Sequence, residues 1–171
     1  MPWFDYLTIR DLDLSREHKS IHRMVTSSSV TMLELRTCKT RSTAQLGRFI
    51  TSFPSLSSLC LRSWTLCPSG LQDTGIRCSG SKSSIRRMVL NPVQNISGLL
   101  DYFLKARPFV TNLNELILQW EYTESIDQNT SLLQGLNELF HHCSQNLEKL
   151  TITVDNSASS HILAESIKLC G

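Results

Sequence analysis

One spacing of apolar residues recurs six times along the chain, with two residues between its first and second members and one between its second and third. The six triplets are Phe4/Leu7/Ile9, Val30/Leu33/Leu35, Leu56/Leu59/Leu61, Ile85/Met88/Leu90, Leu113/Leu116/Leu118 and Leu147/Leu150/Ile152. The last two members of each triplet are two residues apart, a separation at which strand side chains point to the same side. The pattern therefore predicts short strands near residues 6–10, 31–36, 57–62, 86–91, 114–119 and 148–154.

The triplets recur at intervals that define a repeat. Successive triplets begin 26, 26, 29, 28 and 34 residues apart, in or just above the range typical of leucine-rich repeats. One such unit cannot cover its own apolar face, whereas parallel strands stacked about 4.8 Å apart join their faces into one core. The spacing thus predicts an α/β fold over residues 1–171. We expect a single horseshoe-like leucine-rich-repeat solenoid of about six repeats, with parallel strands on the concave face and helices on the convex face.

Apolar residues at helical spacing occupy most intervals between the triplets. They predict helices over residues 43–53, 96–106 and 131–142, and a weaker helix over residues 15–27. Residues 63–84 and 121–130 lack such a period and are expected to be loops. A last helix is predicted over residues 156–170, with no strand after it. The array is therefore expected to be a fragment of a longer one, unless this helix caps it.

Composition and charge exclude several classes of protein. Hydrophobic residues make up 40% of the chain, charged residues 19%, and the formal net charge is +2, so neither disorder nor a nucleic-acid-binding surface is indicated. No apolar run reaches the roughly 18 residues of a membrane helix, and the first ten residues do not resemble a secretory signal. The six irregularly spaced cysteines are expected to be free thiols. These features favour a cytoplasmic or nuclear protein with no membrane partner.

A basic column is expected on the concave face. The residues that follow the third apolar position are Arg10, Arg36, Arg62, Asn91, Gln119 and Thr153. The first three place guanidinium groups about 5 Å apart, where like charges repel unless an acidic group such as Glu34 neutralises them. The functional interpretation is an acidic or phosphorylated protein ligand held by bidentate arginine contacts. The alternative is a solvated basic edge.

Two further columns complete the candidate surface. Cys60, Val89 and Ile117 would form an apolar strip, which either marks a partner site or is simply tolerated. Tyr6 and Met32 are residue types favoured in interface cores. The candidate protein-binding residues are Tyr6, Arg10, Met32, Glu34, Arg36, Cys60, Arg62, Arg87, Val89, Ile117 and Gln119.

No pattern in the sequence predicts catalysis. His141, His142 and Cys143 are adjacent, and adjacent helical residues point in different directions, so we do not expect a metal site. The sequence contains no phosphate-binding or nucleophile motif. We expect no enzyme, with no catalytic residue, metal or cofactor. Cys38 occupies the position at which many leucine-rich repeats carry Asn or Cys to hydrogen-bond the turn.

Three segments, residues 30–36, 53–61 and 146–152, resemble the repeats of fungal F-box proteins with irregular leucine-rich repeats. In that family the F-box docks an adaptor of a cullin ubiquitin ligase, and the repeats select the substrate. The resemblance implies an intracellular, non-enzymatic protein-protein interaction module. The first triplet begins at Phe4 and leaves no room for an F-box, so an adaptor is expected only if an F-box lies outside this chain. The alternative is a truncated or decoy repeat protein with no independent ligand.

Overall fold

The computed structural model describes residues 5–14, 29–66, 85–93, 99–100, 103, 111–121, 126–143, 145–156 and 161–168. Their strands are β1 (Tyr6–Arg10), β2 (Met32–Arg36), β3 (Lys39–Thr40), β4 (Ser58–Leu66), β5 (Arg87–Val93), β6 (Glu115–Glu121), β7 (Lys149–Asn156) and β8 (His161–Lys168). The helices with defined bounds are α2 (Thr43–Thr51) and α4 (Ile126–Cys143).

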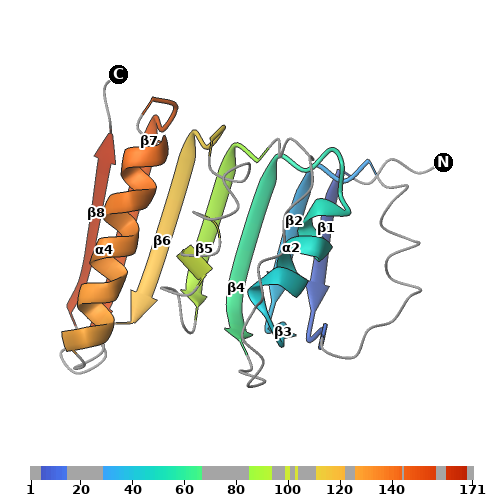
Figure 1. Cartoon of the computed structure of the whole chain (residues 1–171), viewed down its shortest axis with the longest axis horizontal. Coiled ribbons are helices and arrows are strands. Elements are labelled where there is room, and N and C mark those ends of the chain that lie inside the picture. Colours follow the sequence, from blue (N-terminus) through green and yellow to red (C-terminus); the bar gives the residue numbers. More distant parts are fainter. Residues whose placement is uncertain are drawn as a thin grey trace.

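The strands form one sheet in the order β1-β2-β4-β5-β6-β7-β8, and β3 pairs with β4 beside this path (Figure 1). All pairings from β1 to β7 are parallel, and β8 alone is antiparallel to its neighbour. The six predicted strands are confirmed, with β4 to β7 extending beyond their predicted ends. The predicted α/β class and the parallel arrangement of these strands are also confirmed.

The parallel strands share one repeated hydrogen-bond pattern at their amino ends. The carbonyl of Asp5 accepts from the amides of Thr31 and Met32 at 3.0 and 2.9 Å. The carbonyls at residues 31, 57, 86 and 114 accept in the same way from the next strand's entry. The carboxyl ends of the first repeats also match, because Asp11, Thr37 and Ser63 all have φ near +50°. Since they are spaced like the triplets, one local backbone conformation is repeated at these positions.

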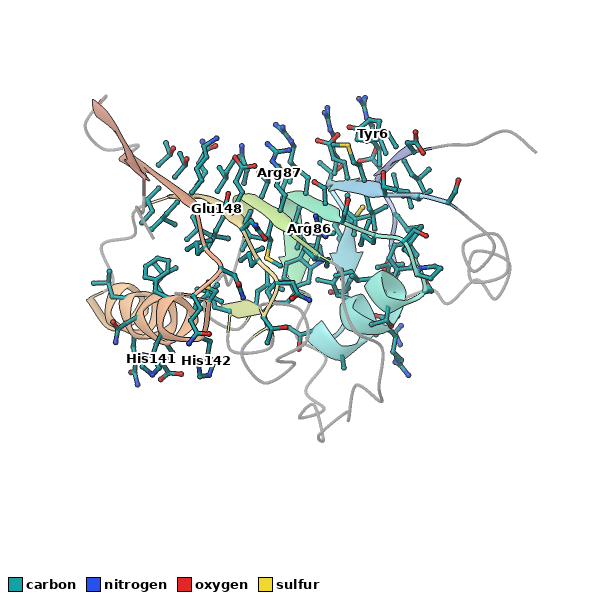
Figure 2. The ribbon with its side chains drawn as sticks, turned by 90° about the horizontal axis from the view of Figure 1, so that it is seen from above. Tyr6, Arg86, Arg87, His141, His142 and Glu148 are labelled. Atoms are coloured by element: carbon teal, nitrogen blue, oxygen red, sulfur yellow. The ribbon has the colours of Figure 1, made fainter. Side chains whose placement is uncertain are left out.

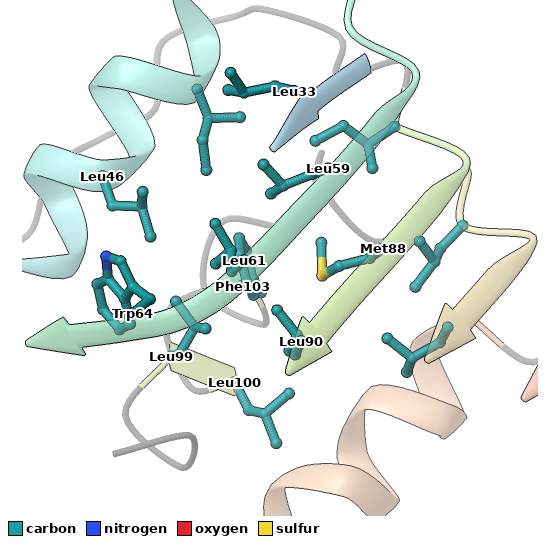
Figure 3. Packing of buried hydrophobic residues seen from close by; sticks show 14 of the residues in the cluster. Leu33, Leu46, Leu59, Leu61, Trp64, Met88, Leu90, Leu99, Leu100 and Phe103 are labelled. Carbon is teal, nitrogen blue, oxygen red and sulfur yellow. The ribbon is translucent and has the colours of Figure 1, made fainter. Parts of the chain in front are cut away.

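The apolar core lies between the sheet and the helices. Both helices pack on one face of the sheet, as Figures 1 and 2 show together. All triplet members from Val30 to Leu150 are buried, and Leu7 and Ile9 of β1 and Ile152 of β7 pack against them. Figure 3 shows β-strand side chains gathered with Leu46 of α2 and with Leu99, Leu100 and Phe103. The alternation within each triplet therefore directs its apolar members to the helical side.

The helix predicted over residues 43–53 is confirmed by α2. The Ser42 hydroxyl caps it by accepting from the Gln45 amide at 3.1 Å, and its buried face carries Leu46, Phe49 and Ile50. The helix predicted over residues 131–142 is confirmed by α4, but its start was placed too late. Apolar periodicity detects only the turns that pack on a core, so a polar first turn escapes it. Neither helix is long and apolar enough to cross a bilayer.

The predicted helix over residues 156–170 is wrong. Residues 149–156 and 161–168 are instead paired antiparallel strands, with Lys149 opposite Lys168 and Asn156 opposite His161. Leu163 and Ile167 are four residues apart, a spacing that suits one face of a helix and equally one face of a strand. The edge of β7 favours the strand, because its free backbone groups can pair with the backbone of another strand but not with that of a helix.

The prediction of a loop from residue 63 is wrong for residues 63–66, because β4 continues to Leu66. Its last residues pair with β3, with Lys39 opposite Thr65 and Thr40 opposite Leu66. Residues 67–84, where the rest of this loop was expected, lie outside the described residues, as does the helix predicted over residues 15–27. Of the helix predicted over residues 96–106, Leu99, Leu100 and Phe103 are described, and all three are helical and buried.

Candidate protein-binding surface

The face of the sheet turned away from α2 and α4 is the candidate surface, here called the open face. Figure 2 shows Tyr6 and Arg87 on this side, while His141 and His142 lie on the side of the helices. The strand registers place its residues in three columns. They are Tyr6, Met32, Ser58, Arg87, Glu115 and Lys149; Thr8, Glu34, Cys60, Val89, Ile117 and Thr151; and Arg10, Arg36, Arg62, Asn91, Gln119 and Thr153.

The three columns of the open face carry an excess of positive charge. They contain five basic residues, Arg10, Arg36, Arg62, Arg87 and Lys149, against the two acidic residues Glu34 and Glu115. The resulting excess of three positive charges exceeds the formal net charge of +2 of the whole chain. An excess of this sign attracts negatively charged groups to the three columns.

Glu34 is the centre of a polar cluster that also contains Tyr6, Thr8, Arg36 and Arg62, here called the Glu34 cluster. Its Oε1 lies 2.7 Å from Arg62 Nε and 2.8 Å from Arg36 Nε. The Arg36 Nε–H bond does not point at this oxygen, and the hydrogen bond instead runs from Arg36 Nη2 to Oε2 at 3.1 Å. The Tyr6 hydroxyl also donates to Oε2. One carboxylate thus binds groups from three neighbouring strands.

Burial and charge act in opposite directions on Glu34, which is only 3% exposed. Burial raises its pKa, but the hydrogen bonds from Arg36 and Tyr6 and the charges of Arg36 and Arg62 outweigh burial and lower the pKa from 4.5 to about 2. The hydrogen bond to Glu34 likewise raises the pKa of Arg36. Glu34 is therefore ionised at neutral pH and offsets part of the repulsion within the arginine column.

Arg10 differs from the other two arginines of its column. The three lie in register, Arg10 beside Arg36 and Arg36 beside Arg62, as predicted. Arg36 and Arg62 bind Glu34, whereas Arg10 is exposed and forms no ion pair with any described residue. The sequence suggested the pairing of Glu34 with Arg36 but missed its contacts with Arg62 and Tyr6. The signal that could have shown them is a lone acid whose register position lies two residues from a tyrosine on one adjacent strand and two residues from an arginine on the other.

A second ion-pair group, here called the Glu115 cluster, joins β5, β6 and β7. Glu115 Oε2 lies 2.6 Å from Arg87 Nε, and Oε1 lies 2.7 Å from Lys149 Nζ. The hydrogen bond from Lys149 is the main cause of a lowered pKa at Glu115, and Arg87 adds to it against the effect of burial. Arg87 was a predicted site residue, and the structure shows it paired rather than free.

The expected apolar strip is interrupted. Cys60 and Ile117 are half-buried, but Val89 is only 7% exposed, so the prediction of a continuous exposed strip through these three residues is wrong. Neighbouring long side chains can cover the short valine, which the alternation of the strand cannot reveal. Burial also raises the pKa of the Cys60 thiol. The exposed apolar groups of the open face are instead Tyr6, at 51%, and Met32, at 38%.

Histidine and cysteine residues do not assemble a metal site in the part of the chain that the structure describes. His141 and His142 are exposed at the end of α4, while Cys143 is buried and its thiol contacts the Leu139 carbonyl at 2.8 Å. Cys38 contacts the carbonyls of Arg36 and Ile9 at 3.2 and 3.7 Å, in line with its predicted role in the turn. Cys38, Cys60 and Cys143 are free thiols, and the other three cysteines lie outside the described residues.

Comparisons of the chain with protein-family models, with curated proteins and with solved structures gave no match.

Proposed function

We propose that this chain is a non-enzymatic protein-interaction module, a leucine-rich-repeat solenoid whose open face binds an acidic or phosphorylated protein segment. The repeated strand entries and the in-register triplets support the solenoid assignment. In the setting that the F-box resemblance suggests, the same surface would select a ubiquitin-ligase substrate, and the adaptor would bind an F-box outside this chain.

The observation that carries the proposal is Arg10, which forms no ion pair with any described residue, whereas the other two arginines of its column bind Glu34. Together, the three arginines and Glu34 leave an excess of two positive charges on adjacent strands. Guanidinium groups present paired donors that match carboxylate and phosphate oxygens. An anionic side chain placed here would meet preorganised donors and relieve the repulsion that Glu34 only partly offsets.

Capture from a native lysate tests the proposal, with the wild-type chain as immobilised bait and mass spectrometry as the readout. Replacing all three arginines would leave the carboxylate of Glu34 without its cations, so the informative variant is Arg10→Glu. It should reduce capture of the partner at least several-fold, because the new carboxylate repels the partner's negative charge. The fold should be unaffected, because Arg10 faces solvent and forms no ion pair with any described residue. The matched control is Lys39→Glu, which makes the same change of charge at an exposed residue of β3.

Salt and phosphatase provide two further readouts. Capture should fall as salt rises from about 0.05 to 0.5 M, since exposed charges are screened over that range. Loss after phosphatase treatment of the lysate would assign a phosphorylated partner, and unchanged capture an acidic one. Equal capture by wild type and Arg10→Glu would overturn the proposal. Recovery of a cullin adaptor with this chain alone would contradict the assignment of adaptor binding to an F-box outside it.

A further inference from the structure

On β1 and β2, the open face carries apolar residues where the strands begin and basic residues where they end. Tyr6 and Met32 are register partners on β1 and β2, and both expose apolar surface. Of the described residues, the only other large hydrophobic side chain with such exposure is Leu133, on α4. The two thus form an apolar point one strand spacing wide, about 4.8 Å, where the strands enter the sheet.

A cationic point lies at the other end of the same two strands. Arg10 and Arg36 are also register partners, each four residues after the apolar residue of its own strand. Four residues of strand span about 13 Å. The later strands lack this arrangement, because their first column carries Arg87, Glu115 and Lys149, and their third column the uncharged Asn91, Gln119 and Thr153. The combination of an apolar and a cationic point is confined to the first repeats.

Between the two points lies the carboxylate of Glu34, buried and saturated by its own donors. It offers nothing more to a ligand and would repel a negative charge placed directly above it. A partner that crosses this region therefore needs an uncharged middle. The footprint is one or two strands wide, which suits a single extended chain better than an α-helix about 10–12 Å across.

We propose that the first repeats bind an extended protein segment at two points, an apolar side chain over Tyr6 and Met32 and an anionic side chain four residues away at Arg10 and Arg36. This inference rests on the proposed function and adds a spacing rule to it. Residues four apart on an extended chain point to the same side, whereas residues three apart point to opposite sides. Both orders of the two groups along the segment satisfy the rule, and either a carboxylate or a phosphate supplies the anion.

Fluorescence polarisation with synthetic labelled 11-residue peptides tests the rule on the wild-type chain. Each peptide carries one Leu and one phosphoserine in a Ser/Thr background, at separations of two, three, four and six residues and in both orders. Separation four should bind at least tenfold more tightly than separation three. Matched peptides with Glu in place of phosphoserine distinguish a carboxylate from a phosphate ligand, and peptides with unmodified serine should lose binding.

Variants assign the two points. Met32→Ser and Arg10→Ala should each weaken the peptide of separation four, and a matched peptide with Ser in place of Leu should be insensitive to Met32→Ser while staying sensitive to Arg10→Ala. Leu133→Ser, which removes a more exposed apolar side chain away from the open face, should change neither. Circular dichroism confirms that each variant is folded. Equal affinity at separations three and four would overturn the spacing rule, while sensitivity of both to Arg10→Ala would still support the proposed function. Absence of binding by every peptide would also overturn the rule, and the capture experiment then judges the proposed function separately.

Discussion

Glu34 and Glu115 lie in neighbouring columns of the open face and have different surroundings. Glu34 is buried, and its carboxylate binds two arginines and a tyrosine. The side chain of Glu115 is 22% exposed, and it binds Arg87 and Lys149, which are themselves about half exposed. An exposed ion pair contributes little because water and salt screen it, whereas a buried carboxylate that loses its ionised form leaves its partners unsatisfied. The two clusters are therefore expected to contribute different amounts to the free energy of unfolding.

The apolar packing beneath the two clusters is similar. Leu35 flanks Glu34 and Leu116 follows Glu115, and both leucine side chains are fully buried on the side of the helices. Any difference between the clusters therefore arises on the open face and not in the core. The predictions below use this contrast, beginning with the effect expected to be largest.

Truncation of the core should affect both regions equally. Leu35→Ala and Leu116→Ala should each lower the free energy of unfolding by about 2–5 kcal/mol, because each removes buried methyl groups and leaves a cavity. Urea denaturation followed by circular dichroism measures both. A loss below about 1 kcal/mol at either position would show that the residue is not part of a packed core.

Glu34→Gln should separate the two clusters. The amide keeps the size of the side chain but leaves Arg36 and Arg62 without their counter-charge, so the free energy of unfolding should fall by about 1–3 kcal/mol. Glu138→Gln, at an exposed position of α4, is the matched control and should change stability by less than about 0.5 kcal/mol. If the two variants were equally stable, Glu34 would be no more than a surface charge.

The low pKa of Glu34 predicts an acid-dependent loss of stability. Its carboxyl has a pKa of about 2 in the folded chain against 4.5 ordinarily, so the unfolded chain binds more protons between these values. The stabilisation is complete above about pH 4.5 and is lost as the pH falls toward 2. Denaturation series from pH 6 to pH 2.5 should show this fall in wild type and a shallower one in Glu34→Gln. Parallel curves would contradict the assignment.

Glu115→Gln should have the smallest effect, below about 1 kcal/mol at low salt, since its ion pairs are exposed to solvent. The difference from wild type should shrink further at about 0.5 M NaCl, where the Debye length is only a few ångströms. Thermal denaturation at both salt concentrations provides the measurement. A loss as large as that of Glu34→Gln would remove the distinction between the clusters.

Much of the fold could be predicted because the last two apolar residues of each triplet are two positions apart, the period of a strand. Leu33 and Leu35, and their equivalents in each triplet, specify the strands, their direction and their register. Predictions failed where one pattern suits two structures. Leu163 and Ile167 fit a helix or a strand, and the choice depends on the open edge of β7, which no local pattern contains.

The sequence could predict where the candidate surface lies, but not how deeply its residues are buried. Alternation identified the three columns, including Arg10, Arg36 and Arg62, and the registers confirm them. It could not show that Val89 is covered or that Glu34 is buried. Those properties depend on the rotamers of long side chains from neighbouring strands, and strand parity does not encode them.

The sequence by itself determined the parallel α/β sheet and which residues share its open face, because each repeat carries the same short-range pattern and must be covered by its neighbours. Only the tertiary structure decided which charges on that face are neutralised. Arg62 and Tyr6 meet at Glu34 because residues 28 positions apart come within hydrogen-bond distance once the strands are stacked. The same stacking leaves Arg10 exposed and unpaired among the described residues, at the place where the proposed function requires a partner's negative charge.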